Sequence, residues 1–404
     1  MSVTKWIENG IENLSGEFGE EKVKKAVELV KNFEVEIPTW SLGPFGGGRF
    51  GSYTPPGYAK NINQKLEDAA FINKLTGAAP MVSAHILWDF SKDGMEADYE
   101  TALQVRDECK ERNLGIGSIN PTYFLKGSES GSLTSPCRET RKRYIEQTIL
   151  GGRLAKEIGN GTLSLWFPDG SLYPGQIDLK ETYLIMKDSL IECRRKIPEE
   201  VTMLIEYKVF EPGTYSTTVP GWGTSYLLAK SMGGNAGVLI DLGHHHHGTN
   251  IEQIVAMLIA EDMRCGFHFN TRYSADDDHA VEPNQENARI FYELLSGGVV
   301  AGGEKNWAYM IDQASGRENR IHALLHSLDS LQLSLAKAAL VNTDGIKECR
   351  EKDEIMLANR LFNDAIINAD VRPVAAKARI EKGLPPDPVK AYLESGYQQK
   401  IGKR

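Results

Sequence analysis

The sequence predicts an α/β protein folded as a (β/α)8 TIM barrel, with helical extensions at both ends. Short apolar, β-branched or aromatic runs recur along the chain, and each has the length of a buried parallel strand. Stretches with helical patterns separate the runs, which indicates βαβ units. Eight such units are the number that closes a barrel. The runs cover residues 35–41, 81–88, 114–120, 162–167, 202–208, 236–244, 265–270 and 309–314.

The stretches between these runs carry helical signals. Asn250 is a good N-cap for a helix that starts at the next residue. Elsewhere, apolar side chains such as Tyr144 and Ile149 recur with charged residues between them. We therefore expect helices over 138–158, 251–260, 288–295 and 321–340.

The two ends of the chain predict additions to the barrel. Residues 1–33 have the pattern of one or two amphipathic helices. The segment 346–404 is helical and charged, and prolines at 373, 385, 386 and 388 interrupt it. We expect a catalytic domain over 1–345, with its N-terminal extension at about 1–33. The segment 346–404 is then a C-terminal arm for contacts between subunits.

A doubly wound open sheet is the rival fold. It would require a glycine-rich turn after the first strand that opens directly into a helix. Residues 43–51 are rich in glycine, but Thr54, Pro55, Pro56 and Gly57 follow them and extend a loop. The barrel is therefore favoured.

Composition excludes several classes of protein. The chain has 404 residues with 46 basic and 55 acidic side chains, a net charge of −9, and this ordinary balance argues against wholesale disorder. Mild acidity argues against a protein that coats nucleic acid or an anionic membrane. Five cysteines lie far apart with no CxxC, as expected of reduced thiols. The N-terminus has no apolar leader-like stretch, so we expect a soluble cytoplasmic protein without nucleic-acid or membrane partners.

Side chains that bind metals end the last four predicted strands. The carboxyl ends of barrel strands converge on one mouth, where the chemistry of this fold takes place. Buried acidic and imidazole groups there are costly unless they are paired or bound to a cation. Their oxygen and nitrogen atoms suit Mn²⁺, Mg²⁺, Co²⁺ or Zn²⁺. The four residues are Glu206, Asp241, His268 and Asp312.

A second set of ligand-type residues follows the same strands. His244 lies three residues after Asp241, and Asp276 and Asp278 are spaced so that they point to one side of an extended loop. Glu206 lies between the two sets and could bridge two ions. Two metals a few ångströms apart are a known catalytic arrangement.

Other polar and aromatic residues near the strand ends allow two interpretations each. Lys208 is either one half of a salt bridge or a cation set against negative charge on a substrate oxygen. His85 is either a buried, hydrogen-bonded histidine or part of the site. Trp88 and Trp166 are either core aromatics or walls on which a sugar ring stacks. The histidines at 245–247 are expected to be solvated loop residues.

The motifs at the strand ends resemble those of the L-rhamnose isomerases. They are Glu-Tyr-Lys, Asp-Leu-Gly-His, Phe-His-Phe-Asn, Asp-x-Asp and Met-Ile-Asp-Gln, and the match runs from about residue 33 to about residue 345. It includes non-catalytic stretches such as Trp-Phe-Pro-Asp-Gly-Ser from Trp166. The branch it resembles has relaxed specificity and also interconverts D-allose and D-allulose. The resemblance implies a TIM-barrel aldose–ketose isomerase, a homotetramer, with two divalent metals per subunit, commonly Mn²⁺.

The resemblance also assigns roles by position. A structural metal would be held by Glu206, Asp241, His268 and Asp312. A catalytic metal would be held by His244, Asp276 and Asp278, with a water. Lys208 would lie near the carbonyl end of the substrate and act in catalysis with Asp312 and His85, while the sugar pocket would be lined by His85, Trp88 and Trp166.

Two further positions qualify this assignment. Phe50 sits where the family has a phenylalanine that closes the pocket of a neighbouring subunit, although it could equally pack within its own chain. The family has Asp-Gln-Ser after the eighth strand, whereas this chain has Asp312, Gln313 and Ala314, followed by Ser315. This departure bears on proton handling and substrate preference, and the metal ligands are unaffected.

Three other functions compete with an isomerase. A metal-dependent abasic-site nuclease would need a basic groove, which the charge of −9 disfavours. A sugar C3 epimerase, or another enzyme of the xylose-isomerase-like barrels, is a closer alternative. An epimerase would need two carboxylates on opposite faces of one carbon and usually one metal, which the second ligand set argues against. A non-catalytic binding protein would not be expected to keep seven ligand-type residues in register.

Overall fold

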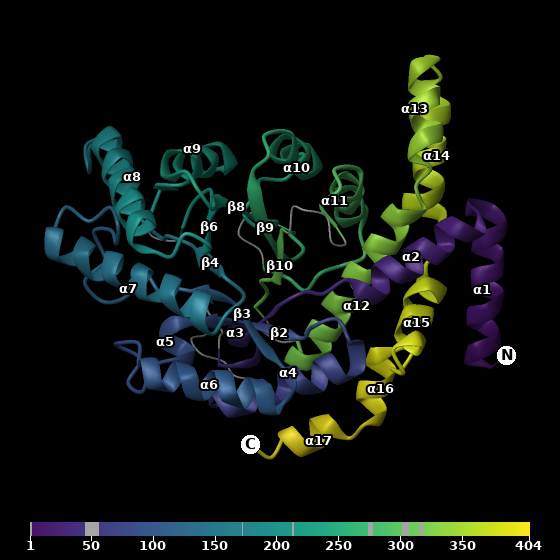
Figure 1. The fold of residues 1–404 in the computed structure, drawn as a ribbon, viewed down its shortest axis with the longest axis horizontal. Coiled ribbons are helices and arrows are strands. Elements are labelled where there is room, and N and C mark those ends of the chain that lie inside the picture. Colours follow the sequence, from purple (N-terminus) through teal and green to yellow (C-terminus); the bar gives the residue numbers. More distant parts are fainter. Residues whose placement is uncertain are drawn as a thin grey trace.

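The computed structural model describes residues 2–44, 56–171, 173–211, 214–273, 278–300, 307–314 and 318–404. A parallel eight-stranded sheet forms its centre and helices surround it (Figure 1), which confirms the predicted TIM barrel. The bridge between Glu36 and Met310 closes the barrel, because it joins the first strand to the last. The strand order is β1-β2-β3-β4-β6-β8-β9-β10.

Each strand lies at one of the eight predicted runs. They are β1 (Ile37–Pro38), β2 (Met81–His85), β3 (Gly115–Asn120), β4 (Thr162–Leu165), β6 (Thr202–Glu206), β8 (Ala236–Asp241), β9 (Arg264–Phe269) and β10 (Ala308–Ile311). Several runs were predicted too long, because their last residues form turns or short helices, such as α3 (Thr39–Leu42) and α5 (Ile86–Asp89). A small antiparallel pair, β5 (Gly170–Ser171) and β7 (Ser216–Thr217), was not predicted.

The four predicted helices are confirmed, with ends within about three residues. Asn250 caps α10 as expected, since its side chain accepts a hydrogen bond from the Gln253 N–H. Among the described residues, no helix has both the length and the apolar character needed to cross a bilayer. The helices that surround the barrel are α4 (Ile62–Thr76), α6 (Tyr99–Glu111), α7 (Arg138–Glu157), α8 (Leu179–Lys196), α9 (Trp222–Met232), α10 (Ile251–Ala260), α11 (Gln285–Ser296) and α12 (Arg320–Leu340).

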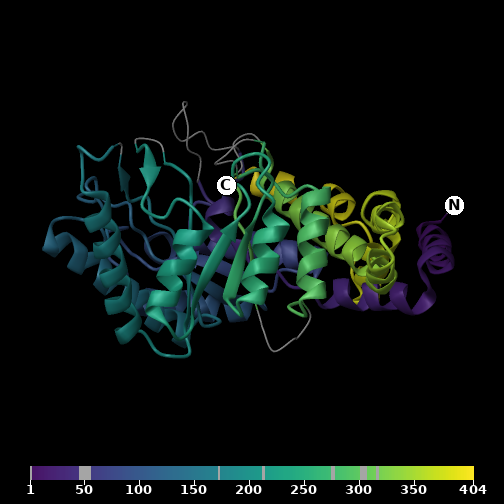
Figure 2. The same cartoon turned by 90° about the horizontal axis from the view of Figure 1, so that it is seen from above.

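Most helices of the two chain ends gather on one side of the barrel (Figures 1 and 2), whereas the last one, which contains Tyr397, lies beside α4. Pro373 and Pro388 lie in the first turns of α15 and α16, where proline is tolerated. The buried Arg379 of α15 donates hydrogen bonds to Gln332 of α12, so this part of the predicted arm packs on its own chain. Contacts with other subunits stay a prediction. These helices are α1 (Val3–Phe18), α2 (Glu20–Asn32), α13 (Thr343–Glu351), α14 (Ile355–Asn363), the π-helix η1 (Asp364–Asn368), α15 (Arg372–Glu381), α16 (Pro388–Glu394) and α17 (Tyr397–Ile401).

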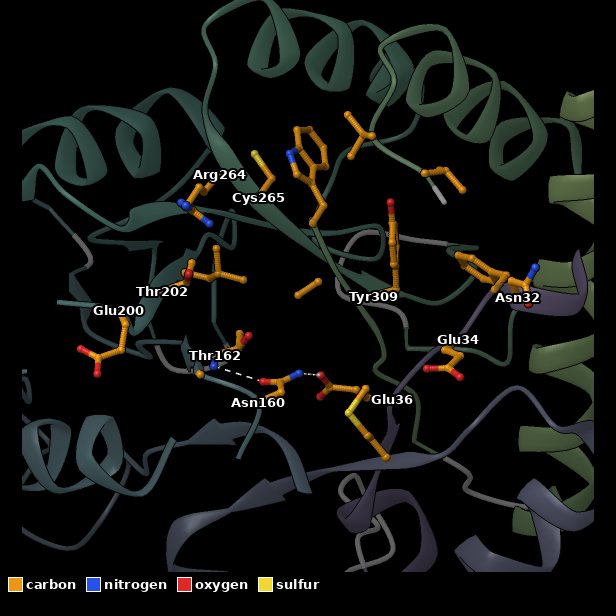
Figure 3. A pocket seen from close by; sticks show the side chains of 18 of the residues that line it. Asn32, Glu34, Glu36, Asn160, Thr162, Glu200, Thr202, Arg264, Cys265 and Tyr309 are labelled. Atoms are coloured by element: carbon orange, nitrogen blue, oxygen red, sulfur yellow. Dashed lines mark hydrogen bonds between the residues drawn. The ribbon is translucent and has the colours of Figure 1, made fainter. Parts of the chain in front are cut away.

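The base of the barrel, where the strands begin, holds a cavity of about 510 Å³ (Figure 3). Glu36 lies inside the barrel there and is 2 % exposed. Its Oε2 accepts hydrogen bonds from Ser83 Oγ at 2.9 Å and from Ser118 N and Oγ at 2.7 and 2.8 Å. Its Oε1 accepts one from Asn160 Nδ2 at 2.7 Å. Gly117 makes room for it, since a Cβ there would lie 2.2 Å from Glu36 Cδ.

Candidate active site

The mouth of the barrel brings together the first set of predicted metal ligands. Side chains alternate along a strand, so residues two positions apart point the same way. Leu204, Leu239 and Met310 form a separate, fully buried cluster of their own. Glu206, Asp241 and Asp312 each lie two residues after one of these apolar residues. His268 of β9 completes the layer. One ligand atom from each of the four lies within 4.8 Å of the others: Glu206, Asp241, His268 and Asp312.

Several atoms in this layer lack hydrogen-bond partners among the described residues. Asp241 Oδ1 accepts from Gly243 N at 2.7 Å and from Asn270 Nδ2 at 2.9 Å, whereas Asp241 Oδ2 has none. Both ring nitrogens of His268 also have none, although Nδ1 lies 3.3 Å from Glu206 Oε2. Unsatisfied buried polar atoms are costly, and a cation among them would remove that cost. The donor set therefore fits a divalent metal.

A second group overlaps the first. Asp241, His244 and Asp278 each offer an atom within 4.8 Å of the others, so Asp241 belongs to both groups. His244 Nδ1 lies 3.1 Å from Glu206 Oε1 and 3.1 Å from the Tyr207 carbonyl oxygen. His244 and Asp278 thus meet as predicted. Asp276, the third member of the predicted set, lies outside the described residues.

Burial and neighbouring charges shift the pKa values of this cluster in opposite directions. Burial raises the pKa of Asp241 to about 6, with Glu206 and Asp312 adding to the rise against His244 and His268. Burial opposes charge on His244 and His268, but the surrounding carboxylates outweigh it and raise their pKa values to about 10 and about 9. Burial also opposes charge on Glu206, but the two imidazoles lower its pKa overall. Without metal, both imidazoles therefore carry protons that a cation would displace.

A cavity of about 390 Å³ opens beside this layer, within the size range of small-molecule sites. Its wall is aromatic. The His85 ring stacks on Trp88 with centroids 3.7 Å apart, and Phe124 lies 5.8 Å from Trp88 and 5.6 Å from Trp166. Trp88 is 40 % exposed, so it is not a core aromatic. The predicted wall residues therefore do line one cavity.

His85 combines the two interpretations that its sequence position allowed. It is buried, and its Nδ1 lies 3.0 Å from Thr122 Oγ1, yet it also lines the cavity. Burial lowers the pKa of the ring to about 3. His85 is therefore a neutral hydrogen-bonding group at ordinary pH.

Lys208 also fits both of its interpretations. Its ammonium group forms an ion pair with Glu211 and lies 5.2 Å from the centre of the Trp166 ring. Lys208 and Glu211 both line the cavity. The pair places one cation and one carboxylate next to the metal-ligand layer.

The structure corrects the prediction for His245. It was expected in a solvated loop, but it is 4 % exposed, and its Nε2 lies 2.7 Å from Tyr207 Oη. The prediction was wrong because the buried Tyr207, at the end of β6, lies within reach of the histidine and supplies a partner. His246 and His247 are exposed, as expected.

Sequence reasoning missed other residues of the cavity. Trp40 donates a hydrogen bond from Nε1 to Asp312 Oδ1 at 2.8 Å, and Glu211 pairs with Lys208. Asn120 could have been found, because it ends a strand like the predicted ligands. Phe124 and Ser164 carried no comparable signal. All five of these side chains line the cavity.

One buried carboxylate near the mouth, at the end of α5, has a structural role. Asp89 accepts hydrogen bonds from Lys65 Nζ at 2.7 Å, Thr39 Oγ1 at 2.6 Å and the His85 N–H at 2.7 Å. Its oxygens accept these bonds within the fold, so Asp89 is not a candidate ligand.

Phe50 and Ser315 lie outside the described residues. Ala314, where the resemblance predicts serine, donates its N–H to the Asp278 carbonyl at 3.0 Å.

Comparison with known proteins places the chain. The L-rhamnose isomerase (RhaA) family matches residues 47–365. A "probable sugar isomerase" of Rhizobium meliloti is 34 % identical across 92 % of this chain and 86 % of that protein. An L-rhamnose isomerase of Listeria monocytogenes is 24 % identical across 80 % and 81 %. A xylose isomerase domain protein of Alicyclobacillus acidocaldarius shares the fold at 12 % identity, with a TM-score of 0.50 over 76 % of this chain and 99 % of that one. The chain therefore belongs to the L-rhamnose isomerase family and is an aldose–ketose isomerase.

Proposed function

We propose that this enzyme interconverts L-rhamnose and L-rhamnulose, and also D-allose and D-allulose. The observation that carries the proposal is the pair of overlapping ligand groups that share Asp241. They border a cavity with an aromatic wall on one side and the Lys208–Glu211 ion pair on another. Isomerisation of an open-chain sugar can use these elements, because cations stabilise negative charge on its oxygens and an apolar wall packs against its carbon chain.

Two divalent cations per subunit are part of this proposal. Mn²⁺ is the proposed resident ion, with Co²⁺, Zn²⁺ and Mg²⁺ as substitutes. When bound, such ions polarise a carbonyl group and stabilise negative charge on the sugar oxygens O1 and O2. One would be held by Glu206, Asp241, His268 and Asp312, and the other by His244, Asp276 and Asp278, with Asp241 in reach of both.

The remaining side chains orient the sugar and stabilise charge. Lys208 brings its positive charge to the cavity, where it would offset negative charge on O1. The neutral His85 ring can exchange hydrogen bonds with sugar hydroxyls, and its stacking on Trp88 keeps both rings in place. Trp166 on the adjoining wall adds apolar surface that excludes water. Phe50 of a neighbouring subunit would cover the pocket in a homotetramer.

For the hydrogen transfer we propose a direct shift from C2 to C1. Among the described residues, Glu211 is the cavity carboxylate outside both ligand groups, and it is already engaged by Lys208. A proton-transfer route would use this carboxylate as the base and would pass through an enediol. Conversion in heavy water separates the routes, since substantial solvent deuterium at C1 or C2 of the product contradicts a direct shift. If the shift is direct, Glu211→Gln should retain hydrogen transfer.

A substrate panel tests the function. Metal-free enzyme reconstituted with Mn²⁺ should convert L-rhamnose, D-allose and L-mannose to ketoses. Comparison of kcat/KM for the three sugars shows which one the enzyme prefers. Exhaustively chelated enzyme should be inactive. Product analysis from a ketose distinguishes the alternative, because an epimerase would return another ketose and an isomerase returns an aldose. Full activity with negligible bound metal would contradict the proposal.

The assembly and location are proposed on separate grounds. Ile355, Met356 and Leu357 of α14 are 54 %, 78 % and 46 % exposed, which supports a subunit contact at this helix. Light scattering should give the mass of a tetramer, and Phe50→Ala should lower kcat/KM without altering that mass. The five free thiols support a reducing, cytoplasmic location.

A further inference from the structure

Two loops at the barrel mouth carry His244 and Asp278, the two members of the second group that the first group does not share. His244 lies on the loop after β8, and Asp278 lies on the loop after β9. We propose that Arg272, paired with Glu286, is a positioning residue that holds these two loops together and thereby sets the affinity of the second metal site. This inference rests on the proposed two-cation function.

Arg272 spans the two loops with one guanidinium group. It follows β9 by three residues, and its Nη1 donates to the His246 carbonyl at 2.5 Å. Its Nη2 donates to the Thr249 carbonyl at 3.2 Å and to Glu286 Oε1 at 2.7 Å. The Arg272 side chain is only 6 % exposed, and its bonds to Thr249 and Glu286 are partly buried, whereas the bond to His246 lies at the surface. The planar fork of arginine suits such simultaneous bonds, which a lysine cannot make in the same geometry.

The backbone beside Arg272 is tied to the segment that carries Asp278. Thr271 pairs with His279, and its N–H donates to the His279 carbonyl at 3.1 Å. His247 Nε2 lies 2.5 Å from the Tyr273 carbonyl, which adds a second link between the loops. The position of Asp278 relative to His244 therefore depends on contacts across these loops.

The first ligand group does not need this link. Its members lie at strand ends, and pairing between strands fixes their positions, as in the register of Asp241 with His268. His244 and Asp278 both lie beyond the strand ends, where no sheet hydrogen bonds hold them to each other. Loss of Arg272 should therefore weaken one metal site and leave the other. Partners outside the ligand shell typically change metal affinity by about 10–100-fold.

Titration of metal-free full-length protein with Mn²⁺, followed by electron paramagnetic resonance of the free ion, tests the inference. The variants are Arg272→Met, Arg272→Lys and Glu286→Gln. Arg289→Met is the matched control, because Arg289 pairs with Glu252 at 2.6 Å between α11 and α10, outside the metal cluster. Wild type and control should bind two ions per chain. Arg272→Met should weaken the second step by about tenfold or more and leave the first within about threefold, with Arg272→Lys and Glu286→Gln intermediate.

Four results would overturn the inference. One is an unchanged second step in both Arg272→Met and Glu286→Gln. Another is equal weakening of both steps, which would indicate a general structural role. A thermal midpoint of metal-free Arg272→Met far below that of metal-free Arg289→Met would indicate the same role. The fourth is binding of fewer than two ions by wild type, in which case the proposed two-cation function fails as well.

Discussion

The two ends of this barrel both contain buried carboxylates, but they satisfy them differently. At the base, Glu36 accepts hydrogen bonds from Ser83, Ser118 and Asn160, and the bond from Asn160 is drawn in Figure 3. At the mouth, Asp241 Oδ2 and both His268 nitrogens have no hydrogen-bond partner among the described residues. The base has the larger cavity, about 510 Å³ against 390 Å³. The candidate metal centre therefore differs from the structural base because some of its buried ligand atoms have no hydrogen-bond partner. Burial and cavity volume do not distinguish the two ends.

The largest expected effect comes from replacing the carboxylate shared by the two ligand groups. Asp241→Asn keeps the shape of the side chain but should lower kcat/KM by more than about a hundredfold, since even partners outside the ligand shell contribute about 10–100-fold. Glu36→Gln at the base is the matched control and should leave kcat/KM within about threefold. Steady-state kinetics with saturating Mn²⁺ checks the pair. Equal losses in both variants would remove the distinction between the two ends.

Proton release upon metal binding gives a pH-dependent test of the mouth. The pKa values of His244 and His268, about 10 and about 9 without metal, mean that both rings are protonated at pH 7.5. Binding should therefore release about two protons, and affinity should fall as pH is lowered. Calorimetry of Mn²⁺ binding in buffers of different ionisation enthalpy measures the number. Release of no protons would contradict these assignments.

The same two histidines affect stability without metal. Because their pKa values are raised in the folded state, their contribution to stability is complete below about pH 6.5 and is lost as pH rises through about 9 to 10. Chelated protein should therefore lose thermal stability across this alkaline range. Metal-loaded protein should lose less, because cations have replaced the protons.

Removing the amide that supports a buried carboxylate should affect Mn²⁺ affinity at the mouth but not at the base. Asn270 donates to Asp241 Oδ1 at 2.9 Å, and Asn160 donates to Glu36 Oε1 at 2.7 Å. Asn270→Ala should weaken Mn²⁺ affinity by about tenfold, whereas Asn160→Ala should leave it unchanged. Metal titration of the two variants side by side decides the matter, and a loss of affinity in Asn160→Ala would show coupling between the ends.

The smallest effect belongs to the base alone. Glu36→Gln places an amide where four donors converge, so at least one donor loses its acceptor. The free energy of unfolding should fall by about 2 kcal/mol. Urea denaturation measures the change, and Ser118→Ala, which removes one donor, should cost less. A neutral effect would mean that Glu36 is not the structural group that its hydrogen bonds indicate.

Much of the fold and part of the site followed from local patterns. The eight runs and the strand-end positions of Glu206, Asp241 and His268 could be predicted, because strand periodicity and the convergence of parallel strands are properties of short segments. His245 could not be predicted as buried, since its partner Tyr207 lies 38 residues away in the chain. The same holds for Trp40, which reaches Asp312 across 272 residues.

The sequence by itself determined the barrel, its helices and the residue types available at the mouth. Only the tertiary structure decided that Asp241 serves both ligand groups, that Lys208 pairs with Glu211, and that Arg272 connects two loops. The physical reason is that each side chain's partners depend on strand register and on how loops pack. Both are set by contacts between segments far apart in the chain, and no local pattern encodes them.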